Sequence, residues 1–93
     1  MNVTVEYAAQ VKQAAGVGSE SIELATPCTV AELARQVAKR HDGPLSGILL
    51  DGAGAPRRSI LVFLGEDQVR WDDDSTLVRD GDIVTLLSPV SGG

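Results

Sequence analysis

Two segments near the start of the chain alternate between apolar and polar side chains. Residues 3–7 read Val-Thr-Val-Glu-Tyr, and residues 21–24 repeat the pattern as Ser-Ile-Glu-Leu. A period of two residues is typical of a β-strand with one buried face. The connection over residues 10–20 contains two glycines, which permit a tight reversal of the chain. The pattern therefore predicts an antiparallel hairpin.

A helical period follows this hairpin. Counted from Val30, apolar residues recur at i+3, i+4, i+7 and i+8, which places them on one face of an amphipathic helix. Thr29 and Glu32 supply a capping box at its start. Gly43-Pro44 should end it, because glycine accepts the left-handed conformation found after many helices and proline cannot continue one. We expect a helix over residues 30–41.

Short apolar runs separated by turn residues fill the second half of the chain. A continuous apolar run of strand length indicates a strand with neighbours on both sides, and Gly and Asp residues mark the turns. The expected elements are a helical turn at residues 45–49, an exposed loop at 51–56, strands at 59–64 and 68–70, and a last strand at 83–87.

The order strand, strand, helix, strand, strand, strand predicts an α+β domain. One main helix that crosses between hairpins covers one face of a mixed sheet of four to five strands if the first and last strands pair in parallel. This is the order of the ubiquitin-like β-grasp. We expect one domain over residues 1–88 and a flexible tail over residues 89–93, since a chain of 93 residues suits a single core.

Charge and cysteine content narrow the range of partners. The formal net charge is −5, which disfavours binding to nucleic-acid phosphates and favours a basic protein surface as partner. A single Cys forms no internal disulfide, and the Cys and His sets that bind zinc are missing. The sequence has no long apolar stretch and no export signal at its start, so we expect a cytoplasmic protein that does not bind membranes.

The last residues carry the candidate chemistry. Gly92 and Gly93 place a free α-carboxylate on a stalk without side chains, a shape suited to the narrow active site of another protein. Pro89 stiffens the root of this tail by fixing its φ angle. Extended, the chain from Val90 to Gly93 reaches about 13–14 Å. No P-loop and no recognisable Ser-His-Asp grouping is present, so we expect no catalysis by this chain alone.

The other reactive side chains have structural interpretations. We expect Cys28 to be a packed residue, His41 to complement the helix dipole, and residues 72–74 to form a solvated acidic turn. None of them has metal-ligand spacing, so no metal site is predicted. The aromatic residues Phe63 and Trp71 suit either the core or an interface.

Nearly the whole chain resembles the MoaD/ThiS-type sulfur carrier family, and most closely its molybdopterin synthase small subunits. The most specific piece is Leu-Ser-Pro-Val-Ser-Gly-Gly at residues 87–93, since tails of this family look like an apolar strand followed by Pro-Val and a terminal Gly-Gly. Two features depart from the family: Ala8 stands where relatives commonly place a large aromatic residue, and the loop at 51–58 is long. The remaining landmarks are residues 5–16, 29–33, 62–69 and 77–84.

The resemblance implies a function for the tail. An E1-like enzyme of the MoeB/ThiF type would adenylate Gly93 with ATP, and a sulfur donor protein would convert the adenylate to a thiocarboxylate, with Gly92 giving access. A large synthase subunit of the MoaE type would then accept the tail, so that the sulfur enters molybdopterin. The carrier would bind no cofactor of its own. The residues expected to contact partners are Phe63, Leu87, Pro89 and Val90.

Three other functions fit the same pattern. The thiocarboxylate could supply thiamine thiazole or cysteine biosynthesis instead of molybdopterin. Alternatively, Gly93 could form isopeptide bonds with lysines, as in a ubiquitin-like protein modifier. The domain could also be a β-grasp interaction module with an inert tail. The Pro89-Val90 pair favours the molybdopterin role modestly and does not decide among them.

Overall fold

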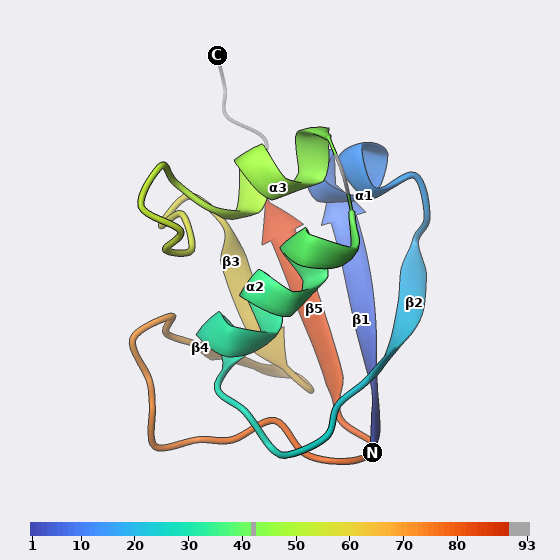
Figure 1. Ribbon diagram of the computed structural model, residues 1–93, viewed down its shortest axis with the longest axis vertical. Coiled ribbons are helices and arrows are strands. Elements are labelled where there is room, and N and C mark those ends of the chain that lie inside the picture. The colour runs from blue at the N-terminus through green and yellow to red at the C-terminus, as the bar shows by residue number, and fades with distance from the viewer. Residues whose placement is uncertain (42, 90–93) are drawn as a thin grey trace.

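The first and last strands of the chain form a parallel pair at the centre of the sheet. The computed structural model describes residues 1–41 and 43–89. Its five strands take the order β2-β1-β5-β3-β4 (Figure 1), and every pairing other than β1 with β5 is antiparallel. The predicted parallel pair and both predicted hairpins are confirmed. The strands are β1 (Asn2–Ala9), β2 (Ser19–Glu23), β3 (Leu61–Leu64), β4 (Asp67–Val69) and β5 (Ile83–Ser88).

The helices lie together on one face of this sheet. Figure 1 shows α2 (Val30–Arg40) crossing in front of the strands, with α1 (Gln10–Ala15) and α3 (Pro44–Leu49) across one end. The predicted α+β, ubiquitin-like β-grasp with one main helix is therefore confirmed. The sequence pattern missed α1, because a six-residue helix is below the length at which helical periodicity or propensity is informative. Its fully buried Val11 shows that packing stabilises it.

Apolar burial against the sheet, rather than capping, holds α2 in place. The predicted capping box is present: the Thr29 side chain accepts a hydrogen bond from the Glu32 backbone, and the Glu32 carboxylate accepts one from the Thr29 backbone. Such a cap contributes about 1 kcal/mol. Burying each large apolar side chain contributes about 1.5–3 kcal/mol. The buried residues of α2 are Val30, Leu33, Ala34, Val37 and Ala38, the stripe that the sequence predicts.

Most predicted boundaries differ by one or two residues in the structure, and two of these differences have a clear physical reason. The helix α2 ends at Arg40, and Gly43, with φ of 98°, is the N-cap of α3 rather than the C-terminal cap of α2. Proline at the first turn of α3 is favourable, because its missing N–H is not needed there. Strand β3 begins at Leu61 instead of residue 59, since the backbone N–H of Ile60 turns back to the carbonyl of Arg57.

Ala9 has an unusual backbone conformation where β1 leads into α1. Its φ is 58° and its ψ is −131°, and it is the non-glycine residue with positive φ among residues 1–41 and 43–89. An L-residue with a Cβ is strained in this region, which glycine occupies readily. In the parallel register Ala9 lies opposite Ser88, the last residue of β5. The strain therefore lies beside the point where the C-terminal segment leaves the sheet.

We expect Ala9→Gly to stabilise the fold by about 0.5–1 kcal/mol, because relief of the strain exceeds the entropy that glycine adds to the unfolded chain. Urea unfolding of the purified variant measures this difference. Ala8→Gly is the matched control: Ala8 lies inside β1 without positive φ, so the same change there should destabilise the protein. If Ala9→Gly and Ala8→Gly destabilise the protein equally, the backbone of Ala9 is not strained.

Candidate functional site

The face of the sheet opposite the helices carries a group of apolar side chains. Because side chains alternate along a strand, the residues between the buried positions of β1, β3 and β5 point to this second face. No helix of the described residues covers it (Figure 1). Ile83 is 45% exposed, and the other members are partly buried by their neighbours. We define the outer sheet face by its apolar members Ala8, Leu61, Phe63, Ile83 and Leu87.

Strand register makes this group continuous. Leu87 in β5 lies between Ala8 of β1 and Leu61 of β3, and Phe63 follows Leu61 on the same side of β3. Thr85 and Glu6 lie in the neighbouring row. A joined apolar surface on a sheet that no helix covers is typical of a protein–protein interface. The structure therefore brings together Phe63 and Leu87, two of the residues predicted from sequence to contact partners.

The tail leaves the domain beside this face. Strand β5 ends at Ser88, which is buried on the helix side, and Pro89 is exposed. The root of the tail thus follows directly after Leu87 of the outer sheet face. The predicted roles of Val90, Gly92 and Gly93 fall outside the described residues and stay predictions.

A cluster of titratable side chains lies on the other side of the sheet. The Tyr7 hydroxyl donates a hydrogen bond to Glu20 Oε1, and His41 Nε2 lies 2.6 Å from the same oxygen. The rings of Tyr7 and His41 meet edge to face, with centroids 6.1 Å apart. The sequence did not reveal this cluster, because the β1–β2 register and the end of α2 bring together residues that are far apart in the chain. Instead of only complementing the helix dipole, His41 pairs with a carboxylate.

The protonation states of Tyr7 and Glu20 allow the cluster to link β1, β2 and the end of α2 by hydrogen bonds. Burial raises the pKa of Tyr7, and its hydrogen bond to Glu20 raises it further, so the phenol remains a proton donor. Partial burial also raises the pKa of Glu20, but the hydrogen bonds with Tyr7 and His41 outweigh that effect and lower its pKa overall. The carboxylate is thereby held in its charged form between two partners.

The remaining reactive residues have the structural roles that the sequence predicts. Cys28 is buried, and burial, with the nearby charge of Glu32, raises the pKa of its thiol. Asp72 is exposed and forms an ion pair with Arg70, and the half-buried Asp73 accepts a hydrogen bond from the Ser75 hydroxyl. In the ranges 1–41 and 43–89 no cluster of three metal-ligating side chains occurs. Within the same ranges no helix has the length and apolar character needed to cross a membrane.

The structure is thus a β-grasp domain with an apolar sheet face, and this face includes the strand that leads to the C-terminal segment. The chain belongs to the ThiS family, whose model matches residues 5–93. It is 28% identical to the molybdopterin synthase sulfur carrier subunit of Chlamydomonas reinhardtii and 27% identical to the small archaeal modifier protein 3 of Haloferax volcanii. Both matches cover 100% of each chain.

Solved structures agree with this assignment. A chain in the crystal structure of the BexX/CysO complex of Amycolatopsis orientalis is 32% identical, with 98% of this chain and 99% of that chain covered and a TM-score of 0.66. The crystal structure of SAMP1 from Haloferax volcanii covers 100% of both chains with a TM-score of 0.85 at 19% identity, which shows the shared fold. The family comprises ubiquitin-like sulfur carriers and modifiers, which are carriers and subunits of complexes.

We expect Phe63→Ser and Leu87→Ser each to weaken binding to a protein partner that docks on the outer sheet face by at least about ten-fold, because each removes an apolar side chain from that face. Surface plasmon resonance with the wild-type protein as reference measures the affinity. Val17→Ser is the control, since Val17 is 44% exposed but lies outside the outer sheet face. Unchanged affinity in both face variants, with circular dichroism showing that they are folded, would contradict this interface.

We expect Glu20→Gln to destabilise the protein by about 1–2 kcal/mol near neutral pH, because it removes the charged acceptor of two hydrogen bonds. The folded-state pKa of Glu20 lies below its ordinary value of 4.5, so the stabilisation is present above about that pH. It is lost as the pH falls through the folded-state pKa. Unfolding free energies of wild type and variant should therefore converge in acid. Glu66→Gln serves as the control, because Glu66 lies in an exposed turn. A difference in unfolding free energy between wild type and Glu20→Gln that does not change with pH would contradict the role assigned to the Glu20 carboxylate.

Proposed function

We propose that the chain is a sulfur carrier whose C-terminal Gly93 is converted to a thiocarboxylate that donates sulfur in molybdopterin biosynthesis. The observation that carries this proposal is the extent of the family match, which continues to the last residue, Gly93. The outer sheet face supports it, since β5 runs along that face and ends at the root of the tail. The chain is then a substrate and a subunit of larger assemblies, and it is not an enzyme alone.

Activation comes first, because a carboxylate is a poor acyl donor. On an E1-like enzyme of the MoeB/ThiF type, a carboxylate oxygen of Gly93 attacks the α-phosphorus of ATP, and pyrophosphate leaves. The resulting acyl-adenylate has AMP as a leaving group. The terminal sulfur of a donor-protein persulfide then attacks the Gly93 carbonyl carbon and AMP departs, which gives an acyl disulfide. A second thiol attacks the donor's own sulfur and forms a disulfide with it, and the thiocarboxylate of Gly93 leaves. The ATP belongs to the activating enzyme, and this chain needs no resident cofactor.

The domain contributes docking and positioning. The outer sheet face would bind the activating enzyme and then a large synthase subunit of the MoaE type, one after the other. From Pro89, which has a fixed φ, the four following residues reach about 13–14 Å when extended. That length suffices to enter a neighbouring active site. Gly92 and Gly93 keep the entering chain thin, because neither has a Cβ.

The choice of molybdopterin rests on the full-length match to a molybdopterin synthase sulfur carrier subunit. A second candidate function has comparable support: a protein modifier, to which the full-length match with a small archaeal modifier protein points. In that role Gly93 forms an amide bond with a lysine of a target protein. Sulfur carriage for thiazole or cysteine biosynthesis is a variant of the first candidate with another acceptor. The sulfur step is common to the carrier functions, so it is tested first.

We expect intact-mass spectrometry to show a mass gain equal to replacement of one oxygen by sulfur at Gly93 after incubation with ATP, an E1-like enzyme and a sulfur source. Addition of a MoaE-type subunit and the pterin precursor should reverse the gain and yield molybdopterin. Retention of the thiocarboxylate under those conditions would contradict the molybdopterin role. Gly93 bound to lysines of cellular proteins would favour the modifier function.

Gly92→Ala and deletion of Gly93 should abolish this transfer without loss of folding, because both residues come after β5, the last strand of the sheet. Gly52→Ala is the matched control: an added Cβ at Gly52 meets no atom within 4 Å, and its φ is not positive. It should leave both transfer and stability unchanged. Full retention of the protein's activity after deletion of Gly92 and Gly93 together would rule out a thiocarboxylate on this tail and leave the inert-tail module as the better account.

A further inference from the structure

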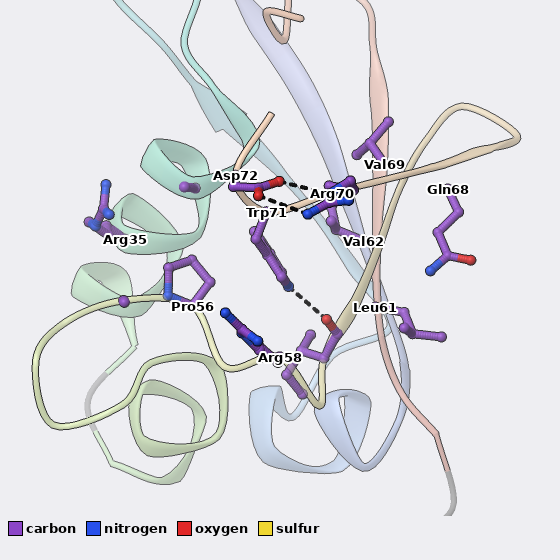
Figure 2. Close-up of a pocket in the computed structure, with 13 residues that line it drawn as sticks. Arg35, Pro56, Arg58, Leu61, Val62, Gln68, Val69, Arg70, Trp71 and Asp72 are labelled. Carbon is purple, nitrogen blue, oxygen red and sulfur yellow. Dashed lines mark hydrogen bonds and ion pairs between the residues drawn. The ribbon is translucent and has the colours of Figure 1, made fainter. Parts of the chain in front are cut away.

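A second surface hollow lies on the helix side, at the β4 edge of the sheet. It has a volume of about 470 Å³ and is formed by α2, the loop after α3, strands β3 and β4, and the turn after β4. Figure 2 shows Pro56 and Trp71 next to each other among the lining residues, with Arg58 below them in this view. Of the outer sheet face, only Leu61 also lines it. We call this the arginine groove, defined by Arg35, Pro56, Arg58, Arg70 and Trp71.

The charge of the arginine groove is opposite to that of the whole chain. Three arginines and one aspartate, Asp72, line it, which gives a formal charge of +2 in a protein of net charge −5. Arg70 forms a fork with Asp72, at 2.9 and 3.0 Å, but the two side chains are 83% and 70% exposed. Exposed pairs of this kind contribute little, so Arg70 can exchange partners at small cost.

Arg58 is the arginine most available to a ligand. It is exposed, and its guanidinium makes no ion pair with any residue of the described ranges. In Figure 2 dashed lines join Arg70 to Asp72, another leaves the indole of Trp71, and none reaches Arg58. Arg35 donates from Nε to the Gly54 carbonyl at 3.1 Å, which orients its side chain at the same groove.

The walls of the groove are preformed. The Trp71 indole N–H donates to the Ile60 carbonyl at 2.7 Å, which fixes the ring and leaves an apolar face for contact. The opposite wall is held by Asp51, whose carboxylate accepts hydrogen bonds from the backbone of Ala53 and Ala55. A rigid aromatic side chain beside arginines is the composition enriched at binding hot spots. Prior order also lowers the entropic cost of binding.

We propose that the arginine groove binds a short acidic segment of a partner protein, with carboxylates on Arg58 and Arg35 and one apolar side chain between Pro56 and Trp71. Charge complementarity selects an acidic partner, and an acidic segment would be repelled elsewhere by the net charge of −5. The hollow is open and has walls from four segments, which suits an extended peptide better than a small molecule that must be enclosed. The proposal does not depend on sulfur transfer at Gly93.

Peptide display on the full-length protein, followed by fluorescence titration, tests this proposal. Trp71 is the single tryptophan of the chain, so its emission reports on the groove directly. Enriched peptides should carry two or more Asp or Glu beside an apolar residue and should change this emission. Their Asn and Gln counterparts should bind about ten-fold more weakly, and raised salt should weaken the acidic peptides.

Arg58→Ser should reduce the affinity for the enriched peptides about five-fold, in line with loss of one exposed charge pair. Arg79→Ser is the matched control, because it removes the same charge from an exposed position outside the groove. It should change the affinity little. Three results would overturn the proposal: no enriched acidic peptide, equal binding by the Arg58→Ser variant, or saturation of the Trp71 response by inorganic phosphate or ATP with the same dependence on Arg58, which would indicate a small-anion site.

Discussion

The parallel pairing of β1 with β5 is the interaction on which the rest of the structure depends. It places the first and last strands side by side at the centre of the sheet, so the chain between them must supply the outer strands on both sides and the helices that cross the sheet. The same pairing sets Leu87 beside Ala8 on the outer sheet face and places the end of β5 next to the strained residue Ala9. The C-terminal tail therefore starts from a central strand, whose position the whole sheet fixes, rather than from a loop.

Alternation along these two strands gives the sheet two different faces. One face is the core: Val5 and Leu86 pack beneath α2, and the contacts among Tyr7, Glu20 and His41 tie the helix end to the β1–β2 hairpin. The other face has apolar side chains that are partly exposed and do not belong to the buried core. That exposure has a cost in water, which binding to a partner can offset. The fold thus separates the residues that maintain it from those available for recognition.

The two surfaces described here differ in the forces that would bind a partner. The outer sheet face is apolar and lies next to the tail, whereas the arginine groove is cationic and lies at the β4 edge. Apolar burial gives affinity that changes little with salt, while the arginines give orientation and a salt-dependent encounter. Because the two surfaces share only Leu61, an acidic segment in the groove and a partner on the sheet face are distinct contacts. A single partner that carries both kinds of surface would bind with added specificity.

Local patterns determined much of this protein. Period-two segments, the Thr29–Glu32 capping box and the apolar stripe of α2 depend on neighbouring residues, so the sequence alone predicted the strands, the main helix and the β-grasp order, and residues 87–93 indicated the family. Only the tertiary structure decided the short helix α1, the cluster of Tyr7, Glu20 and His41, and the meeting of Arg35, Arg58 and Arg70 in one groove. These features depend on strand register and loop path. Both are set by packing between residues far apart in the chain, which no local period records.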